Sequence, residues 1–146
     1  MSKRFTLAEA ESLLPVIEKA LREALSVKAE YDRAESSLQA TVQKIMFAGG
    51  MTIDSYSVGQ ERSKRDSSAE RLKAALETIQ ERGCLVKDLD VGLVDFPTLF
   101  RGEEVYLCWK LGEVAIRFWH GTEEGFAGRK PIAQDFLDNH EGDPLN

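Results

Sequence analysis

A chain of 146 residues, 42% of them hydrophobic, is long enough to bury the core of one domain without help from disulfides or structural metals. Its net charge of −6 comes from interleaved acidic and basic residues, so no basic stripe is available to bind nucleic acid. Its longest uncharged apolar run, Leu13 to Ile17, is far too short to cross a membrane.

The two cysteines, Cys84 and Cys108, have neither the C-x-x-C spacing of a redox motif nor the companion ligands of a zinc ribbon. We therefore expect reduced, packed thiols. The chain starts with basic and then acidic residues instead of an apolar signal-like run, which predicts a cytoplasmic location. No nucleotide-binding or other cofactor motif is found, and no cofactor is expected.

A long helix is predicted to begin at Thr6, because Thr6 and Glu9 have the spacing of a capping box. Pro15 lies beyond the first turn and predicts a kink or a short break. Apolar residues then recur at alternating steps of four and three, typical of a helix that packs lengthwise on another. Two charged residues, Lys28 and Glu35, interrupt this seam, so the coiled coil is imperfect.

Gly49 and Gly50 are predicted to end the first helix, and residues 51–59 have the composition of a connection. A second helix is expected from about Glu61 to Arg82, with Gly83 as its stop. Residues 6–82 therefore predict an antiparallel helical hairpin. The first helix is nearly twice as long as the second, so part of its apolar stripe stays uncovered.

The hydrophobic period changes from helical to alternating after Gly83, which predicts an antiparallel β module over residues 84–132. Four strands are expected: Cys84–Lys87, Leu93–Phe96 ended by Pro97, Glu104–Lys110 and Glu113–His120. The acidic residues 133–146 have little to bury and predict a disordered tail. The predicted fold is a single α+β domain over 1–146, with the hairpin packed on a small β-meander.

A two-residue turn at Leu111–Gly112 would set the register of the last hairpin. This register pairs Trp109 with Val114, Leu107 with Ile116, and Val105 with Phe118, which gathers an apolar face toward the helices. Tyr106 and Trp119 would then share the opposite face as an aromatic patch.

Four segments in fixed order stand out: FTLAEAESLLP at the start, GLVDFP at 92–97, VYLCWKLGE at 105–113 and WHGTEEGFAGRKPI at 119–132. Together they resemble a bacterial family, domain of unknown function 2203. The resemblance covers most of the chain and implies an uncharacterised family without an established activity. The family is sometimes labelled as related to cell division, a label that long charged helices attract through generic coiled-coil similarity.

The most informative stretch for chemistry is the loop after the last strand, where three glycines precede Arg129 and Lys130. Backbone amides and a guanidinium fork could hold an anion there. Alternatively, the glycines serve tight turns and Arg129 pairs with an acidic residue such as Asp95. Cys108 has apolar neighbours and predicts a buried thiol instead of a nucleophile.

His120 closes the last strand, close in sequence to Glu124, and Asp95 is a plausible neighbour from the adjoining strand. His120 and Glu124 could ligate a metal, or His120 could act as a general base held by a carboxylate. The alternative is a structural histidine in an ordinary hydrogen bond, because His140, the other histidine, lies in the predicted tail.

Two functions remain open from the sequence. The first is a non-enzymatic scaffold that forms homodimers through the uncovered part of its first helix. The second is a protein or enzyme that binds a small anion or metal, with a candidate site in the β module at Asp95, His120, Glu124 and Arg129. The sequence identifies no substrate and leaves enzymatic activity undecided.

Overall fold

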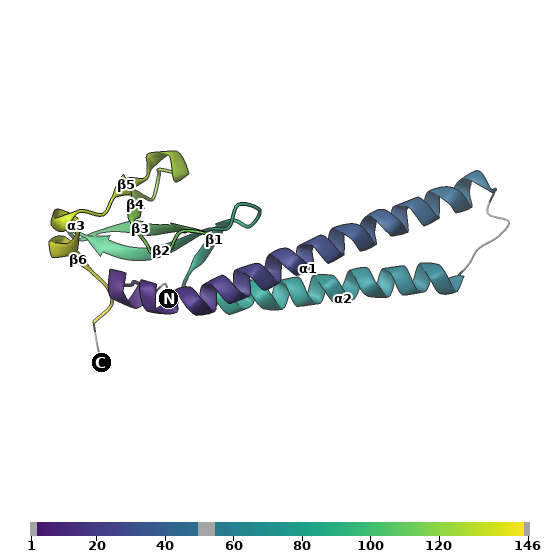
Figure 1. The fold of residues 1–146 in the computed structure, drawn as a ribbon, viewed down its shortest axis with the longest axis horizontal. Coiled ribbons are helices and arrows are strands. Elements are labelled where there is room, and N and C mark those ends of the chain that lie inside the picture. Colours follow the sequence, from purple (N-terminus) through teal and green to yellow (C-terminus); the bar gives the residue numbers. More distant parts are fainter. Residues whose placement is uncertain (1–2, 50–54, 145–146) are drawn as a thin grey trace. The chain divides into compact units, whose positions relative to one another are not determined.

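The computed structural model describes residues 3–49 and 55–144 and divides the chain into two compact units (Figure 1). The sheet unit comprises Met1–Leu21 and Leu76–Asn146, and the hairpin unit comprises Arg22–Ala75. Both long helices contribute residues to both units, and the single domain over 1–146 stays a prediction. The fold class is the predicted one, α+β with two long helices followed by an antiparallel sheet.

Helix α1, Leu7–Phe47, begins at the predicted capping box. The Thr6 backbone N–H donates to Glu9 Oε1, and the Glu9 backbone N–H donates to Thr6 Oγ1, both at 3.1 Å. Pro15 lies inside the helix, which continues without the expected break. Pro15 is on the exposed side of α1, where water can satisfy the carbonyl that its missing N–H leaves unpaired. Gly49 follows the helix with φ +72°, as a C-terminal cap requires.

Helix α2, Ser55–Gln80, starts six residues before the expected Glu61. The predicted connection over 51–59 was wrong for its second half, while Gly50 and residues 51–54 lie outside the described residues. Gly59 lies exposed within α2, because a glycine costs about 1 kcal/mol in a helix but does not by itself end one. After Gln80 the chain turns, and Gly83 adopts φ +94°. Neither α1 nor α2, nor any shorter helix in the described ranges, has the length and apolarity needed to cross a membrane.

The sheet of the sheet unit is antiparallel throughout, with strand order β1-β2-β3-β4-β5 and with β6 beside β2. Its strands are β1 Leu85–Asp88, β2 Leu93–Phe100, β3 Glu103–Lys110, β4 Phe118–Gly121, β5 Lys130–Pro131 and β6 His140–Glu141. A short 3-10 helix η1, Phe126–Gly128, precedes β5, and helix α3, Gln134–Asn139, precedes β6.

Pro97 does not end the second strand as predicted, since β2 continues through it to Phe100. The Pro97 carbonyl accepts the Phe5 backbone N–H at 2.7 Å, so the main-chain polar groups of Pro97 face the N-terminal segment. Along this edge β1 pairs with β2 before Pro97 and β6 pairs with β2 after it. The missing N–H therefore falls in a gap between two partner strands and breaks no ladder bond.

The predicted two-residue turn at Leu111–Gly112 was wrong. Strand β4 begins only at Phe118, and it pairs Leu107 with Trp119 and Cys108 with Phe118. Residues 111–117 form a loop in which Trp109 Nε1 donates to the Glu113 carbonyl and the Glu113 side chain accepts the Lys110 backbone N–H. The loop thus satisfies its polar groups locally, and a predicted core residue, Val114, is 87% exposed.

This register exchanges the two faces of β4 relative to the prediction. Trp119 lies on the face of Leu107, whereas Phe118 and His120 lie on the face of Cys108. The expected Tyr106–Trp119 patch is therefore not formed: Tyr106 contacts the His120 ring, and Trp119 joins other aromatic residues.

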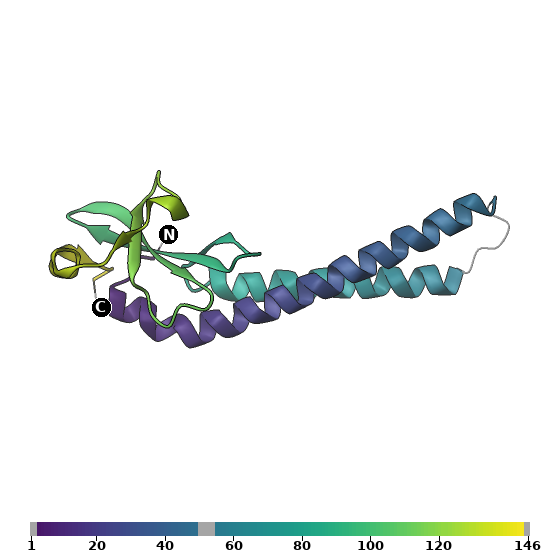
Figure 2. The same cartoon turned by 45° about the horizontal axis from the view of Figure 1, so that its top comes forward.

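The hydrophobic core of the sheet unit lies between the start of α1 and one face of the sheet (Figures 1 and 2). Its buried members from the helices and the sheet include Ile17, Leu21, Ile79, Val94, Phe96, Leu107 and Trp109. As predicted, an apolar face of the sheet packs on helix, and Leu107 and Trp109 belong to that face. The residues of β4 that pair with β3 are not the predicted ones. The opposite face of the sheet carries the side chains of Asp95, Cys108 and His120.

Residues 133–144 of the predicted disordered tail are instead folded into the sheet unit, and the last two residues of that tail lie outside the described residues. Phe136, in α3, is 2% exposed and stacks with Phe100 and Trp119 at ring separations of 4.9 and 5.0 Å. The next residues reach the start of the chain, where His140 Nε2 accepts the Leu7 backbone N–H at 3.0 Å. One buried aromatic residue and backbone pairing thus order an otherwise acidic segment, drawn in yellow in Figure 2.

Candidate functional site

Three side chains that can ligate a metal or exchange a proton lie on the sheet face opposite Phe96 and Leu107. Asp95 in β2 pairs directly with Cys108 in β3, and His120 in β4 pairs with Tyr106 in β3. Because successive side chains alternate between faces, Asp95, Cys108 and His120 share one face. Strand β3 separates the strands of Asp95 and His120, so their side chains meet over it, beside Cys108.

His120 and Asp95 form a buried pair. His120 Nε2 lies 3.0 Å from Asp95 Oδ2, and the two side chains are 4% and 0% exposed. The other ring nitrogen, Nδ1, lies 2.8 Å from the Gly121 carbonyl, which can only accept a hydrogen bond, so Nδ1 carries a hydrogen. One further proton is then shared between Nε2 and the carboxylate, and the ring orientation is fixed at both nitrogens.

The contact with His120 uses only one of the two carboxylate oxygens of Asp95. Its Oδ1 atom is buried and accepts no hydrogen bond of normal geometry in the described part of the chain, although the Cys108 thiol lies close enough to help lower the pKa of the carboxyl. Burial raises the pKa of the Asp95 carboxyl, and the nearby His120 ring opposes that rise. A buried carboxylate oxygen without a partner is costly, so it marks a position where a cation or a further donor would stabilise the fold.

Cys108 is the third member of the cluster and is fully buried. Burial first, and the neighbouring Asp95 second, raise the pKa of its thiol to about 12. The thiol therefore stays protonated at neutral pH, which disfavours Cys108 as a nucleophile and agrees with the predicted buried thiol. Within the described residues, Asp95, Cys108 and His120 form a group whose potential ligand atoms all lie within 4.8 Å of one another.

Glu124, predicted as a metal ligand with His120, is used differently. Its Oε1 atom accepts the Gly121 backbone N–H at 2.8 Å and contacts the Lys130 ammonium. The Lys130 hydrogen bond, and then the Gly121 N–H, hold the pKa of Glu124 below its usual value. A Cβ on Gly128 would lie 2.8 Å from Glu124 Cβ, so Gly128 makes room for this side chain. The anion that the glycine loop holds is the chain's own carboxylate.

Arg129 is also engaged within the chain. Its guanidinium donates two hydrogen bonds to Glu113, at 2.7 and 3.3 Å, and lies over the rings of Phe118 and Phe126. Only 10% of its side chain is exposed. The sequence allowed for an acidic partner such as Asp95, and the partner found is Glu113. Arg129 thus ties the 111–117 loop to β5, and its fork is not free to bind an anion.

Of the four residues predicted as a site, the structure brings Asp95 and His120 into direct contact, pairs Glu124 with Lys130, and pairs Arg129 with Glu113. Arg129 nevertheless lies near the cluster, because its positive charge lowers the pKa of the Cys108 thiol against the effect of burial. Cys108 belongs with the first two and was missed. The sequence signal for it was its place in the VYLCWKLGE segment, on a strand between those of Asp95 and His120. The predicted register hid this signal, because it put His120 and Cys108 on opposite faces.

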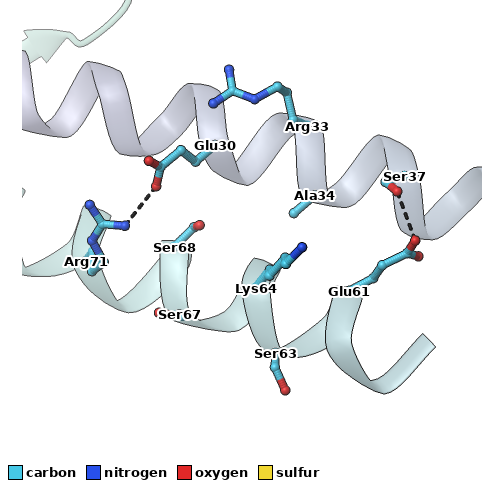
Figure 3. Close-up of a pocket in the computed structure, with 10 residues that line it drawn as sticks. All are labelled: Glu30, Arg33, Ala34, Ser37, Glu61, Ser63, Lys64, Ser67, Ser68 and Arg71. Carbon is cyan, nitrogen blue, oxygen red and sulfur yellow. Dashed lines mark hydrogen bonds and ion pairs between the residues drawn. The ribbon is translucent and has the colours of Figure 1, made fainter. Parts of the chain in front are cut away.

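The hairpin unit has a hollow of a different character, between α1 and α2, with a volume of about 600 Å³ (Figure 3). The residues that line it are mostly of polar types and include Ser37, Glu61, Lys64, Ser68 and Arg71. Ser37 donates to Glu61, and Arg71 pairs with Glu30 at 2.8 Å, so a hydrogen bond and an ion pair join the two helices here. The residues that line this hollow include neither histidine nor cysteine, in contrast to the buried cluster of the sheet.

Comparison with family models gives a match over residues 3–132 to a family described as an uncharacterized conserved protein, DUF2203. A comparison with curated proteins found no match, and neither did a comparison with solved structures.

Proposed function

Since the chain belongs to the uncharacterized DUF2203 family, we propose its function from the site itself: the sheet unit binds a small cation at Asp95 and His120. The observation that carries the proposal is the buried Asp95 Oδ1 atom, which lacks a partner beside an oriented imidazole. A cation would supply the missing interaction and replace the shared proton.

A cation fits this site better than an anion does. The buried Asp95 carboxylate would repel an anion. The Arg129 guanidinium, which lies close enough to act on Cys108, has its charge paired with Glu113. The glycine loop is likewise filled by Glu124. The buried free thiols of Cys84 and Cys108 suit a reducing compartment such as the cytoplasm, which supports that location.

Thermal unfolding of the wild-type chain with a panel of phosphates, carboxylates and divalent metal ions tests this proposal. A ligand at one hundred times its Kd stabilises the folded state by about 2.7 kcal/mol, which is readily measured. We expect stabilisation by divalent metal ions alone. The effect should disappear in Asp95→Asn and persist in Glu124→Gln, a matched carboxylate change outside the pair. Stabilisation by anions, or by no compound in the panel, contradicts the proposal.

A second function, self-association through the helices, is favoured by the surface of the hairpin unit. Several large apolar side chains lie exposed there: Val42, Met46, Phe47 and Tyr56. The hairpin unit also has nearly balanced charge, with nine basic and eight acidic residues, whereas the sheet unit has ten and seventeen. A charge-balanced surface with exposed apolar residues is suited to contact a second copy, forming the scaffold expected from the long first helix.

Sedimentation velocity at tens of micromolar chain tests self-association. The wild type should sediment as a dimer, and Phe47→Ser should shift the population toward monomer. Phe47 is 91% exposed, so this substitution should leave the fold intact. Val114→Ser, at an 87% exposed position in the sheet unit, is the matched control and should leave the dimer unchanged. A monomeric wild type rules out this second function.

A further inference from the structure

We propose that Cys108 completes a three-ligand centre with Asp95 and His120 for a divalent ion of the zinc class. This inference rests on the proposed cation binding and identifies both its missing ligand and its metal. Neither the predicted pair His120 and Glu124 nor the exposed carboxylates of the sheet unit would form such a centre.

The geometry of the three groups is close to that of a zinc site. Bonds of about 2.0 Å to nitrogen or oxygen and about 2.3 Å to sulfur, in tetrahedral arrangement, place ligand atoms roughly 3.3–3.6 Å apart. One pair in the cluster, His120 Nε2 and Asp95 Oδ2, is 3.0 Å apart, and all three ligand atoms lie within 4.8 Å of one another. Small side-chain rotations would bring them onto one ion. Binding would release to solvent the Cys108 thiol proton and the proton shared by His120 and Asp95.

The hydrogen bond that would orient His120 on a metal is already formed. Metal-bound histidines typically donate their other ring N–H to a carbonyl or carboxylate, which fixes the tautomer and the ring. In this chain the Nδ1 hydrogen is directed to the Gly121 carbonyl, leaving Nε2 as the atom that faces Asp95 and Cys108.

The ligand types select the metal. Magnesium and calcium prefer shells made of oxygen atoms, whereas one sulfur, one nitrogen and one oxygen suit zinc and the neighbouring late first-row divalent ions. Three protein ligands leave a fourth position for water or a small molecule, as in catalytic zinc sites. Burial of all three side chains would exclude bulk water from the centre and strengthen the ion's interactions.

Cobalt(II), a spectroscopic substitute for zinc, provides a direct test in the full-length chain. Cobalt bound to a thiolate gives an intense near-ultraviolet charge-transfer band that oxygen and nitrogen ligands do not give. We expect this band in the wild type at one equivalent of cobalt, with displacement by zinc. It should vanish in Cys108→Ala, where cobalt affinity should fall by more than about 100-fold, since even second-shell changes cost 10–100-fold.

Cys84→Ala is the matched control. Cys84 is the second buried free thiol of the sheet unit, lies in its hydrophobic core and should not contribute to the band. A band retained in Cys108→Ala, or lost in Cys84→Ala with the fold intact, overturns the assignment of Cys108. Stabilisation by metal without any thiolate band leaves the proposed cation binding standing and overturns the three-ligand centre.

Alkylation of the wild type gives a second measurement that does not depend on a folded variant. During a brief pulse of moderate denaturant with a thiol reagent, zinc should slow modification of Cys108 at least about tenfold relative to Cys84, because a coordinated thiolate is withheld from the reagent. Equal protection of both cysteines would show general stabilisation by zinc instead, and would contradict ligation by Cys108.

Discussion

The sheet unit and the hairpin unit use polar groups in opposite ways. The His120–Asp95 pair and the Arg71–Glu30 pair have similar lengths, 3.0 and 2.8 Å. The first is almost completely buried, whereas the side chains of the second are 51% and 39% exposed. Solvent screens the exposed pair, while the buried pair carries a desolvation cost that its surroundings must offset. A buried polar pair such as His120–Asp95 is therefore a better indicator of a functional site in this chain than an exposed ion pair.

The two units also differ in how they bury apolar residues. The sheet unit gathers aromatic and branched side chains into one core, to which the N- and C-terminal segments contribute. The hairpin unit buries small residues such as Ala24 and Ala75 and leaves Met46 and Phe47 in solvent. The following substitutions test whether stability resides mainly in the sheet unit.

The largest expected difference is between two phenylalanines. Phe136→Ala should destabilise the folded state by about 3–5 kcal/mol, because it removes a buried ring from an aromatic cluster. Phe47→Ala should change stability by less than about 0.5 kcal/mol, because Phe47 is 91% exposed. Urea unfolding, followed at a dilution where the chain is monomeric, measures both. Equal effects would contradict the division into a packed and an open unit.

A second contrast concerns the two acidic residues in ion pairs. Asp95→Ala should cost about 3 kcal/mol, because it leaves the buried His120 ring without its partner. Glu30→Ala should cost less than about 1 kcal/mol, because Arg71 is exposed and also contacts Glu23. Metal-free chains should be compared by chemical unfolding. An Asp95→Ala variant with nearly the wild-type free energy of unfolding would contradict a buried His120 ring that depends on Asp95 as its partner.

The buried thiols should make the sheet unit sensitive to alkaline pH. Burial raises the pKa of Cys84 from 9.0 to about 12, so above pH 9 the unfolded chain loses a proton that the folded chain retains. Stability is therefore fully present below pH 9 and falls as the pH rises toward 12, by up to about 1.4 kcal/mol per pH unit for this group.

Unfolding curves of the wild type and Cys84→Ala between pH 8 and 10.5 isolate this contribution. The variant should show a shallower decline with pH, whatever its absolute stability. The hairpin unit contains no cysteine and should contribute nothing to the difference. Parallel declines in the two proteins would show that Cys84 is not buried as described.

The smallest expected effect concerns the cap that the C-terminal segment provides. His140→Ala should cost about 1 kcal/mol, the usual value of a helix cap, because the Leu7 N–H loses its acceptor. Hydrogen exchange of the first turn of α1 should accelerate in the variant, while exchange in the hairpin unit stays unchanged. Unchanged protection of Leu7 would indicate that the C-terminal segment does not cap the helix.

Local signals in the sequence predicted most of the fold. The Thr6 capping box, the two helices and the change to alternating periodicity after Gly83 depend on neighbouring residues and were read correctly. The break expected at Pro15 and the strand end expected at Pro97 were wrong for one reason. At Pro15 the missing N–H lies on the exposed side of the helix, where water can bind the unpaired carbonyl. At Pro97 it lies on the edge of β2 that has no partner strand at this position, so no strand-to-strand hydrogen bond is lost. The sequence alone does not reveal which side of a helix or strand is unpaired.

The candidate site was harder to predict because it depends on register. A shift of three residues between β3 and β4 moved His120 to the other face of the sheet, and with it the neighbours of Cys108. The shift arises from the Glu113 contacts with Lys110, Trp109 and Arg129, which join residues up to sixteen positions apart. Asp95 was correctly placed beside His120. The docking of the C-terminal segment through Phe136 is a tertiary contact that an acidic composition conceals.

The most direct test of the account is a crystal structure of the chain grown with zinc, with anomalous scattering recorded above and below the zinc absorption edge. The account predicts one strong anomalous peak between β2, β3 and β4, about 2.3 Å from Cys108 Sγ and about 2.0–2.1 Å from His120 Nε2 and an Asp95 carboxylate oxygen. The His120–Asp95 hydrogen bond should be replaced by the ion. Zinc bound only at surface carboxylates, with that hydrogen bond intact and Cys108 unligated, would contradict it.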